Sequence, residues 1–437
     1  MRETVPFFDR HLETQPRAEL KTLQWNRLQA LTREVWATNP FWRAKWRSAG
    51  LAGPDDLASW DDFFRFPFMV KRELAEDQLA HPPFGTNLTY PIDRYVRLHQ
   101  TSGTTGEPIR WLDTEEAWQW WARCWQFVFR GAGVTEADRV FFAFSFSLFI
   151  GFWSGFEGAR QLGALAIPGG GQDSPTRLRW METLGASALV CTPSYALHLA
   201  DIAREREIDL HRLAVRRTIH AGEAGAGIPA IRRRIEEAWN AKCYDHAGMT
   251  EVGPYSFECI EQNGPHVIES EFIAEVLDPA TGRHVDEGEI GELILTNLGR
   301  TGSPIFRYRT GDRVRWSTGP CECGRTFARL PGGILGRVDD MLIVRGINVF
   351  PSALEAVIRQ FPAVEEFQIE AYKRGELDEI RLHLEVDGPS PEGMVRAVVE
   401  AVRLAVGIRV EAVAAPPKSL PRFELKAKRV VRRTDAS

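Results

Sequence analysis

The chain has 437 residues, of which 44% are hydrophobic and 26% are charged. This composition is typical of globular proteins, and the length suits two or three domains. The net charge of −5 argues against nucleic-acid binding, which usually requires a basic excess. The N-terminus lacks the apolar core of a signal peptide, and the six cysteines are too scattered for a disulfide framework. We therefore expect a soluble, cytoplasmic protein that binds neither nucleic acid nor a membrane.

The first predicted elements are helical. Residues 13–49 carry Leu and Trp at helical spacing. A strand over residues 95–99 then leads into the sequence TSGTTGEP, residues 101–108. A Trp-rich amphipathic helix is expected over residues 115–129. The chain therefore begins with helices and changes character just before TSGTTGEP.

The middle of the chain alternates between strands and helices. Residues 140–156 are aromatic and uncharged, but they are at the short limit for a membrane span. We interpret them as a buried strand, over 140–146, that runs into a loop and a helix. Strand-like and helical segments then alternate up to about residue 205. Such alternation predicts βαβ units and a mainly parallel sheet.

The pattern changes again after about residue 265. Residues 272–277, 291–296 and 314–316 are typical of antiparallel strands joined by Gly-rich turns. From residue 337 onward, strands and helices form a unit of about 100 residues, a common domain size. We therefore predict an α/β protein with a large N-terminal domain, residues 1–336, and a small α+β C-terminal domain, residues 337–437. The N-terminal domain combines βαβ subdomains with a small β-rich one.

The stretch TSGTTGEP is a candidate phosphate-binding loop. Glycine lets the backbone approach an anion closely, and backbone N–H groups with Ser and Thr hydroxyls supply donors without bulk. The spacing matches neither a Walker A sequence nor a G-x-G-x-x-G fingerprint. Because Gly, Ser and Thr are also common in exposed turns, this stretch alone leaves phosphate binding and a plain turn as alternatives.

Four further motifs follow this loop along the chain. They are residues 245–251 (DHAGMTE), 306–312 (FRYRTGD), 336–346 (GRVDDMLIVRG) and 420–426 (LPRFELK). Together the five motifs resemble the adenylate-forming (AMP-binding) enzyme superfamily. Residues 191–196 (CTPSYA) and 348–352 (NVFPS) resemble the phenylacetate–CoA ligase family in particular. The resemblance covers nearly the whole chain.

The resemblance implies both a fold and a reaction. The fold is that of the adenylate-forming enzymes, in which the C-terminal domain is a mobile lid. The reaction is ATP-dependent activation of an aromatic or arylacetic acid to an acyl adenylate, followed by transfer to the thiol of coenzyme A. AMP and pyrophosphate are released, Mg²⁺ is the expected cofactor, and a homodimer is the expected assembly. Such chemistry depends on positioning and charge neutralisation more than on a covalent nucleophile.

The resemblance also assigns ATP-binding roles to particular residues. The β- and γ-phosphates would be held by Thr101, Ser102, Gly103, Thr104, Thr105 and Gly106. Thr250 and Glu251 would lie by the α-phosphate, with Glu251 as a Mg²⁺ ligand because a hard cation takes oxygen. Asp312 would accept hydrogen bonds from the ribose hydroxyls. Arg337 would reach the ribose or a phosphate, and Glu223 would lie near the adenine.

Two further assignments fall in the C-terminal part of the chain. Lys426 would reach the α-phosphate and stabilise negative charge during adenylation. Asp339 lies at the hinge position of the family, where the C-terminal domain swings between an adenylating and a thiol-transferring pose. A cap or turn residue is the alternative for Asp339, which is followed by a second aspartate.

The chain departs from the family pattern at three positions. Ala247 stands where relatives usually have an aromatic residue that stacks on adenine. Either His246 or another ring substitutes for it, or the adenine pocket is looser. Glu107 stands in place of a lysine in the phosphate loop, and Leu425 in place of a glycine before Lys426.

Aromatic residues in the 140–156 stretch are candidates for the acid-binding pocket. In the resembling family this region lines the pocket, which we assign to Phe144, Phe146, Phe149 and Gly248. Aromatic walls suit a flat, apolar acid. The alternative is that these rings belong to the ordinary core.

Four residues form a candidate metal site. Cys321 and Cys323 are a C-x-C pair on a predicted turn, a suitable half-site for a tetrahedral metal. Cys259 and His266 are the natural other half, and some phenylacetate–CoA ligase relatives look similar here and carry zinc. Four protein ligands would make the zinc structural. Buried, idle thiols are the alternative, whereas the other three cysteines are predicted to be core residues.

Three other functions stay open at this point. The adenylate could pass to a carrier-protein thiol or to an amine instead of coenzyme A. The chain could be a nucleotide- or acid-binding protein without catalysis, as Ala247, Glu107 and Leu425 would suggest. It could also be an interaction module built around zinc.

Overall fold

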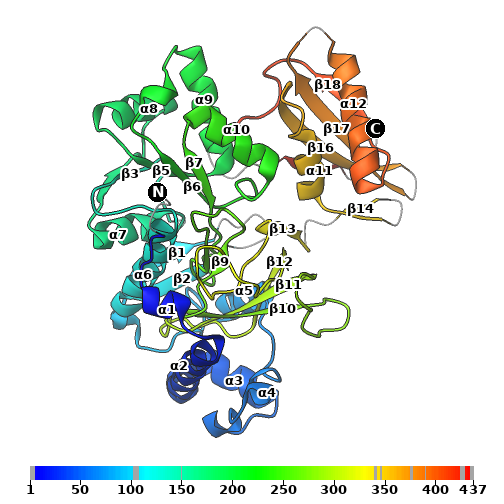
Figure 1. Ribbon diagram of the computed structural model, residues 1–437. Coiled ribbons are helices and arrows are strands. Elements are labelled where there is room, and N and C mark those ends of the chain that lie inside the picture. The colour runs from blue at the N-terminus through cyan, green and yellow to red at the C-terminus, as the bar shows by residue number, and fades with distance from the viewer. Residues whose placement is uncertain are drawn as a thin grey trace.

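The computed structural model describes residues 5–101, 108–148, 150–338, 342–344, 347–374, 377–388, 390–423 and 429–433. Figure 1 shows a large N-terminal part, coloured from blue to yellow, and a smaller C-terminal part in orange and red. Each part has buried hydrophobic residues of its own. No helix within these described ranges is long and apolar enough to cross a bilayer.

Helices open the chain. They are α1 (Arg10–Thr14), α2 (Arg17–Thr38), α3 (Pro40–Ser48), α4 (Trp60–Phe63) and α5 (Lys71–Ala80). The helical character expected over residues 13–49 is confirmed, and the chain breaks between α1 and α2 and between α2 and α3. Asn39 caps α3 by accepting a 3.1 Å hydrogen bond from the Trp42 N–H, and Pro40 takes the first helical position. Short 3₁₀ helices cover Pro54–Asp56, Ile92–Arg94 and Leu210–Arg212.

Two antiparallel strands flank the candidate phosphate loop along the chain. Strand β1 (Tyr95–Gln100) enters the loop and β2 (Arg110–Thr114) leaves it. Helix α6 (Glu115–Gly131) follows at once, and the Thr114 side chain caps it by accepting from the Ala117 N–H at 3.2 Å. The predicted Trp-rich helix is therefore confirmed, and it is buried along most of its length.

The βαβ region forms a five-stranded parallel sheet, as predicted. Its order is β4-β3-β5-β6-β7. The strands are β3 (Arg139–Phe142), β4 (Leu165–Pro168), β5 (Ala188–Cys191), β6 (Arg217–His220) and β7 (Lys242–Asp245). The helices are α7 (Trp153–Leu162), α8 (Ser174–Thr183), α9 (Pro193–Glu205) and α10 (Pro229–Trp239). Strand β3 ends four residues before the predicted limit at 146, so Phe144 and Phe146 lie beyond it.

The β-rich subdomain is antiparallel, as predicted. The hairpin β8 (Ser256–Phe257) and β9 (His266–Val267) precedes a sheet of order β10-β11-β12-β13. That sheet contains β10 (Phe272–Leu277), β11 (Ile290–Asn297), β12 (Tyr308–Arg315) and β13 (Ile334–Arg337). Strand β12 starts earlier than the predicted 314–316 segment and includes most of the 306–312 motif.

The C-terminal part is a small α+β unit. Its four-stranded sheet has the order β18-β17-β16-β19, with a separate hairpin of β14 and β15. The elements are β14 (Leu342–Val344), β15 (Ile347–Val349), α11 (Pro351–Ile358), β16 (Val364–Arg374), β17 (Leu377–Val386), α12 (Pro391–Val406), β18 (Glu411–Ala415) and β19 (Val430–Arg433). The predicted fold class is confirmed, and the boundary at residues 336/337 stays a prediction.

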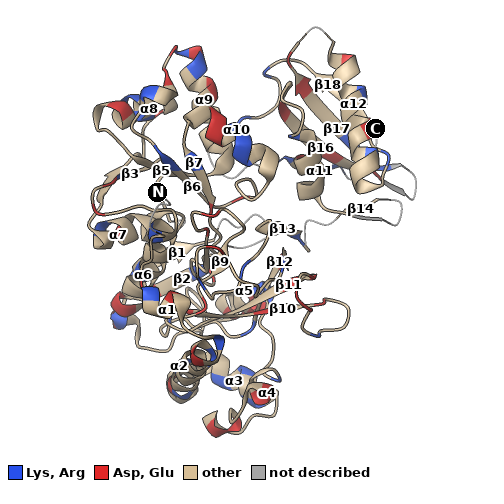
Figure 2. Cartoon of the chain, viewed as in Figure 1, with Lys and Arg blue, Asp and Glu red and all other residues tan. Residues whose placement is uncertain are grey.

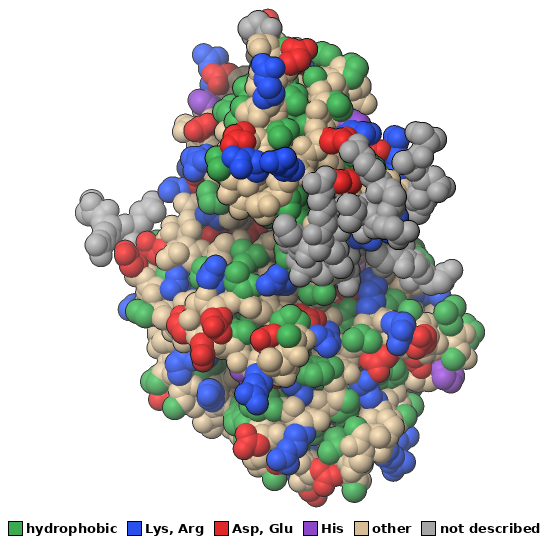
Figure 3. Space-filling view, turned by 90° about the vertical axis from the view of Figure 1, so that its right-hand side faces the viewer, with side chains coloured by type: hydrophobic (Ala, Val, Ile, Leu, Met, Phe, Trp, Pro, Cys, Tyr) green, Lys and Arg blue, Asp and Glu red, His purple; other side chains and the backbone are tan. Residues whose placement is uncertain are grey.

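Charged residues are of mixed sign over the parts shown in the figures. Figure 2 shows both Arg and Glu on α10, which lies on the side of the N-terminal part toward the C-terminal part. The face in Figure 3 mixes blue and red side chains. All six cysteines are buried and free, including the predicted core residues Cys124, Cys191 and Cys243.

Candidate active site and metal centre

Two hydrogen bonds between Thr101 and Ile109 close the base of the candidate phosphate loop. The Thr101 N–H donates to the Ile109 carbonyl at 2.9 Å, and the Thr101 hydroxyl accepts from the Ile109 N–H at 3.0 Å. Thr101 is therefore buried at the base of a hairpin-like loop. Ser102, Gly103, Thr104, Thr105 and Gly106 lie outside the described residues, so their phosphate contacts stay a prediction.

The 245–251 motif begins at the carboxyl end of strand β7. Ligands of open parallel sheets bind beyond the carboxyl ends of the strands. From Asp245 the chain runs into a tight loop, in which the Gly253 N–H donates to the Met249 carbonyl at 2.9 Å. Thr250 and Glu251 are buried within this loop. The sheet thus delivers both predicted α-phosphate residues to its ligand-binding edge.

A lysine from the N-terminal helices lies beside the Glu251 carboxylate. Lys71, the first residue of α5, places its Nζ 3.3 Å from the Glu251 Oε1. Lys71 could not be identified from the sequence, because 180 positions separate it from Glu251 and no local pattern marks it. The contact shows that the Glu251 carboxylate is within reach of a cation.

The two predicted ribose residues are neighbours on adjacent strands. Asp312 on β12 and Arg337 on β13 are directly paired in register. The Arg337 Nη1 donates to the Asp312 Oδ1 at 3.0 Å, and the Asp312 side chain is buried. The strand pairing and this hydrogen bond together fix the position of the Asp312 carboxylate on the sheet.

Asp245 is a candidate site residue to which the sequence analysis gave no role. Burial raises the pKa of its carboxyl to about 7, and the Glu258 carboxylate adds to the shift. A Cβ atom on Gly227 or Gly333 would lie 2.9 or 2.5 Å from the Asp245 Oδ2, so two glycine backbones pack directly against this carboxyl. Its place at a strand end, first in the motif, is the signal that could have identified it.

Glu223 lies at the side of the site that faces the C-terminal part. Its Oε1 accepts from the Ser194 N–H at 2.8 Å and from the Ser194 hydroxyl. It is also among the charges that act on Glu355 and Arg429, both in the C-terminal part. Its expected position near adenine stays a prediction.

The predicted acid-binding rings belong to one aromatic cluster. Phe144 and Phe146 lie 5.4 Å apart between ring centroids, and Phe146 packs against Trp153 at 4.6 Å. Phe144 is buried, whereas Phe146 is only partly buried. The pocket assignment of these rings stays a prediction, and Phe149 lies outside the described residues.

His246 connects the 245–251 motif to the aromatic residues. It is buried, its Nδ1–H donates to the Ser256 carbonyl at 2.5 Å, and its ring lies 4.5 Å from that of Trp125. Burial lowers its pKa to about 4, so the ring is neutral at pH 7. A Cβ on Gly248 would lie 3.5 Å from the His246 Nε2, which places Gly248 beside the same ring. Adenine stacking by His246 stays a prediction.

Lys426 and Asp339 lie outside the described residues, so their roles also stay predictions.

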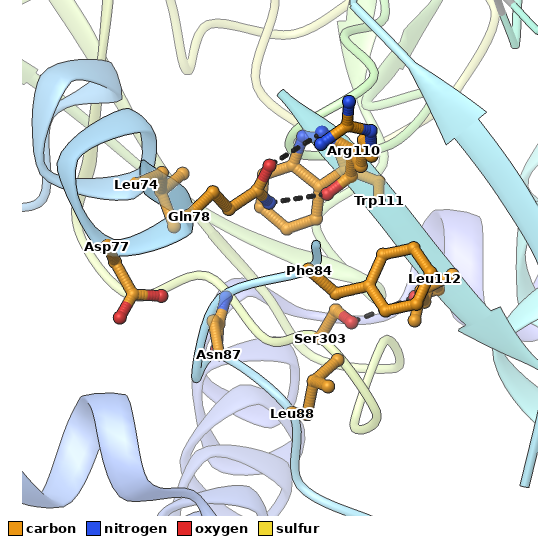
Figure 4. A pocket seen from close by; sticks show the side chains of 10 residues that line it. All are labelled: Leu74, Asp77, Gln78, Phe84, Asn87, Leu88, Arg110, Trp111, Leu112 and Ser303. Atoms are coloured by element: carbon orange, nitrogen blue, oxygen red, sulfur yellow. Dashed lines mark hydrogen bonds between the residues drawn. The ribbon is translucent and has the colours of Figure 1, made fainter. Parts of the chain in front are cut away.

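A small pocket lies between α5 and β2, and Figure 4 shows the side chains that line it. Its volume of about 10 Å³ is room for one water molecule. In Figure 4 the Gln78 amide, hydrogen-bonded to the Arg110 backbone, closes one side. This pocket is too small to hold a substrate.

The four predicted metal ligands do come together. Cys259, His266, Cys321 and Cys323 are buried, and their ligand atoms all lie within 4.8 Å of one another. Cys259 follows β8, and His266 lies on the paired strand β9. The second pair lies on a turn in which the Gly324 N–H donates to the Cys321 carbonyl at 2.9 Å, with a φ of +81° at Gly324.

The distances within this cluster fit a tetrahedral metal ion. Zinc–sulfur bonds of about 2.3 Å and zinc–nitrogen bonds of about 2.0 Å space tetrahedral ligands about 3.5–3.8 Å apart. Here the Cys259 and Cys321 sulfurs are 3.8 Å apart, and the Cys323 sulfur is 3.5 Å from the His266 Nε2. The His266 Nδ1–H donates to the Phe327 carbonyl at 3.0 Å, which leaves the Nε2 lone pair for a metal.

The N-terminal segment covers the cluster of three cysteines and His266. Val5 packs against the three cysteines. Arg325, two residues after Cys323, donates to the Glu13 carboxylate at 2.5 Å and is fully buried with it. Burial lowers the pKa of Arg325, but the Glu13 carboxylate and Cys323 outweigh this effect, so the net shift is upward. A positive charge therefore lies beside the cysteine cluster.

Comparison with known proteins places the chain in a class. The family model described as "AMP-binding enzyme" matches residues 87–299, and the one described as "AMP-binding enzyme C-terminal domain" matches residues 346–433. The phenylacetate-coenzyme A ligase of Thermus thermophilus is 34% identical over 436 residues, which cover 94% of this chain and 96% of that protein.

The solved structures of one ligase are similar over the whole chain. 2-Hydroxyisobutyryl-CoA ligase in the postadenylation state with 2-HIB-AMP has a TM-score of 0.93 and 33% identity, covering 98% of this chain and 92% of that chain. The same ligase with 2-HIB-AMP and CoA in the thioesterification state has a TM-score of 0.75 and 34% identity, covering 98% and 93%. The fold, the site and these matches define an adenylate-forming enzyme. Within that class, the chain belongs to the phenylacetate–coenzyme A ligase family.

Proposed function

We propose that this enzyme activates an aromatic or arylacetic acid. The chain is an AMP-forming acid–coenzyme A ligase, which makes an acyl adenylate from ATP and passes the acyl group to the thiol of coenzyme A. The observation that carries the proposal is its full-length similarity to a phenylacetate-coenzyme A ligase. The aromatic cluster around Phe144 and Phe146 supports the choice of a flat, apolar acid.

The chemistry divides into two half-reactions. In the first, a carboxylate oxygen forms a bond to the α-phosphorus of ATP, and the bond from that phosphorus to the β-phosphate oxygen breaks, releasing pyrophosphate. In the second, the thiol loses its proton, its sulfur bonds to the acyl carbon, the bond from that carbon to the bridging oxygen of the acyl–phosphate anhydride breaks, and AMP leaves with that oxygen. Only the first step develops charge on a polyphosphate, so it is the step that needs cationic groups.

Particular residues are proposed for the first half-reaction. Glu251 would hold Mg²⁺, and its buried carboxylate fits a hard cation that takes oxygen ligands. Bound there, Mg²⁺ would neutralise phosphate charge. Thr250 lies next to it, Asp312 with Arg337 would hold the ribose, and Lys426 would act at the α-phosphate. The phosphate loop, residues 101–106, would hold the β- and γ-phosphates.

The placement of the C-terminal part supports an adenylation-side pose. The TM-score falls from 0.93 to 0.75 between two states of the same ligase, although the covered share of this chain is the same. The Ser352 hydroxyl donates to the Leu335 carbonyl at 2.5 Å, and the Arg313 guanidinium lies 4.8 Å from the Phe350 ring centroid. We propose that Asp339 is the hinge through which these contacts exchange for those of the second half-reaction.

We also propose that the Cys₃His cluster binds zinc. The distances fit a tetrahedral site, and four protein ligands leave no open position for catalysis. The zinc would tie the β8–β9 hairpin to the 321–323 turn. A cytoplasmic location, expected from the N-terminal sequence, and a homodimer, which the family resemblance implies, are further proposals, testable by fractionation and by light scattering.

The test of the proposed function is an acid-dependent pyrophosphate-release screen. Purified enzyme is incubated with ATP, Mg²⁺ and a panel that includes phenylacetate, benzoate and 2-hydroxyisobutyrate, with and without coenzyme A. We expect the fastest release with an aromatic or arylacetic acid and a thioester product only when coenzyme A is present. A preference for the aliphatic acid would contradict the proposed substrate class. Adenylate formation without any thioester would favour a carrier protein or an amine as the acceptor.

A further inference from the structure

Two side chains donate hydrogen bonds to the backbone carbonyls of the loop that carries Thr250 and Glu251. The Arg300 Nη1 donates to the Thr250 carbonyl at 2.7 Å and to the Glu251 carbonyl at 3.1 Å. The Asn297 Nδ2 donates to the Val252 carbonyl at 3.0 Å. Three consecutive carbonyls are thus bound by the segment that leaves strand β11. A buried carbonyl needs a partner, and here side chains supply it.

Arg300 is held rigidly in this position. Its Nε and Nη2 donate to the two Asp113 carboxylate oxygens at 2.6 and 2.7 Å, and both side chains are fully buried. The guanidinium carbon lies 4.8 Å from the ring centroid of Trp111 and 5.1 Å from that of Trp121. The planar fork therefore has few alternative orientations.

The partner carboxylate belongs to the strand that leaves the phosphate loop. Asp113 lies on β2, four residues after Ile109, whose backbone closes the base of the loop with Thr101. One arginine thus joins the strand behind the phosphate loop to the motif that presents Glu251. A buried ion pair adds little net stability, because apolar residues of similar size can often replace it. The hydrogen bonds from Arg300 to the carbonyls of Thr250 and Glu251 therefore suggest a role beyond stability.

We propose that Arg300 is a positioning residue for adenylation, an inference that rests on the proposed function. It fixes the distance between the phosphate loop and Glu251, so the metal-binding carboxylate and the phosphate donors meet the same polyphosphate. It makes no contact with substrate in this role. Misplacement of reacting groups by about 1 Å can cost about 100-fold in rate.

The chain offers a matched control in Arg307. This residue also makes a two-bond pair with a buried carboxylate, Glu275, at 2.9 and 2.8 Å. Its Nη1 also donates to two carbonyls, those of Phe64 and Phe66. Those carbonyls belong to the N-terminal helical region, so loss of the fork should affect folding but not adenylation.

The experiment compares Arg300→Lys with Arg307→Lys in both half-reactions. Pyrophosphate release with phenylacetate is measured across a Mg²⁺ titration, and thioester formation is measured separately from presynthesised phenylacetyl adenylate and coenzyme A. For Arg300→Lys we expect a fall of about 10- to 100-fold in adenylation and a higher Mg²⁺ requirement. Thioester formation should change less than about twofold, because that step involves no polyphosphate. Arg307→Lys should leave both rates within about twofold of the wild type.

Several outcomes would overturn the inference. Equal slowing of both half-reactions in Arg300→Lys would mean a general structural role, and an unchanged Mg²⁺ dependence would mean that Glu251 is not displaced. If Arg300→Lys does not fold, Asp113→Asn gives the same comparison, since it loosens the fork and keeps the arginine. Wild-type enzyme that makes no thioester with any acid contradicts the proposed function. Active wild type with an unaffected Arg300→Lys contradicts only the role of Arg300.

Discussion

Arg300 and Arg307 make the same kinds of hydrogen bond but bind different segments of the backbone. Each donates twice to a buried carboxylate, Asp113 or Glu275, and twice to backbone carbonyls. Each lies beside aromatic rings, two indoles for Arg300 and phenyl rings that include Phe68 for Arg307. The pair around Arg300 is bonded to the loop of Glu251, and the pair around Arg307 to the N-terminal helical region.

The comparison shows that the chemistry of a buried ion pair does not reveal its purpose. Both pairs satisfy a charge that would otherwise be costly to bury. We propose that the two arginines differ in role because their remaining guanidinium N–H groups bind different backbone segments. A third buried arginine, Arg325, makes the point again, because its pair with Glu13 ties the N-terminal segment to the cysteine cluster.

The largest effect should come from removing the carboxylate that Arg300 is proposed to position. Glu251→Gln should reduce pyrophosphate release by about 1,000-fold with little change in thioester formation from a presynthesised adenylate, because it removes an electrostatic contact of the first half-reaction. This value sets an upper limit for Arg300→Lys. A larger loss in Arg300→Lys than in Glu251→Gln would show that Arg300 does more than position this carboxylate.

Replacing each ion pair with apolar residues tests the comparison more strictly. The double variants Arg300→Met with Asp113→Leu, and Arg307→Met with Glu275→Leu, remove both charges of a pair and leave both carbonyls unpaired. We expect similar losses of unfolding free energy, about 2–4 kcal/mol, measured by urea denaturation. Adenylation should fall about 100-fold in the first variant and less than about threefold in the second. Equal activities would break the distinction.

Loss of the proposed zinc site should lower the stability of the fold and leave the rates of both half-reactions unchanged. Cys321→Ser should lower the zinc content, measured by elemental analysis, and lower the melting temperature by about 5 °C. The matched control is Cys243→Ser, a buried cysteine outside the cluster, which should keep its zinc. Full zinc content in Cys321→Ser would rule out the four-ligand assignment.

Asp245 is the first residue of the 245–251 motif, which ends at Glu251. The dependence of protein stability on pH tests whether its carboxyl is protonated in the fold. Its pKa is raised from 3.8 to about 7 by burial and by Glu258, so the folded protein binds a proton that the unfolded chain has lost. Its contribution to stability therefore falls as pH rises from about 4 to about 7, by at most about 1.4 kcal/mol per pH unit. Asp245→Asn should remove this slope in urea unfolding measured between pH 4.5 and 8. Identical slopes in variant and wild type would show that the carboxyl is not protonated in the fold.

The smallest effect should come from an exposed ion pair between the two parts. The Lys418 Nζ lies 2.8 Å from the Glu205 Oε1, and both side chains are largely exposed. Solvent screens such a pair, so Lys418→Ala should leave the melting temperature unchanged within measurement error. A clear loss would mean that exposed contacts contribute to holding the C-terminal part in place.

Much of the fold could be predicted because it follows from local patterns. Alternating strands and helices predicted the parallel sheet, and Gly-rich turns predicted the antiparallel one. The helical spacing over 13–49 gave no sign of the break at Asn39 and Pro40. One boundary was wrong for a local reason, because the apolar residues of the 140–146 segment extend past the true end of β3 into the loop.

The candidate site was predictable where a motif carries the chemistry. The cysteine pair with its distant partners could be found because cysteine and histidine are uncommon residues, and Asp312 and Arg337 were singled out because each belongs to a motif of the family; their contact with each other was not predicted. Arg300 and Lys71 were missed for a different reason. Arginine and lysine in a loop or at a helix start are usually exposed, and only the tertiary fold brings Arg300 under the indoles and Lys71 to Glu251.

The most direct test of the account is the product stoichiometry of the complete reaction. The wild-type enzyme is incubated with ATP, Mg²⁺, phenylacetate and coenzyme A, and AMP, pyrophosphate and thioester are quantified together by chromatography and mass spectrometry. The account predicts one of each product per acid consumed, with no thioester when any substrate is omitted. Release of ADP and phosphate in place of AMP and pyrophosphate, or absence of thioester with every aromatic and arylacetic acid in the panel, would contradict it.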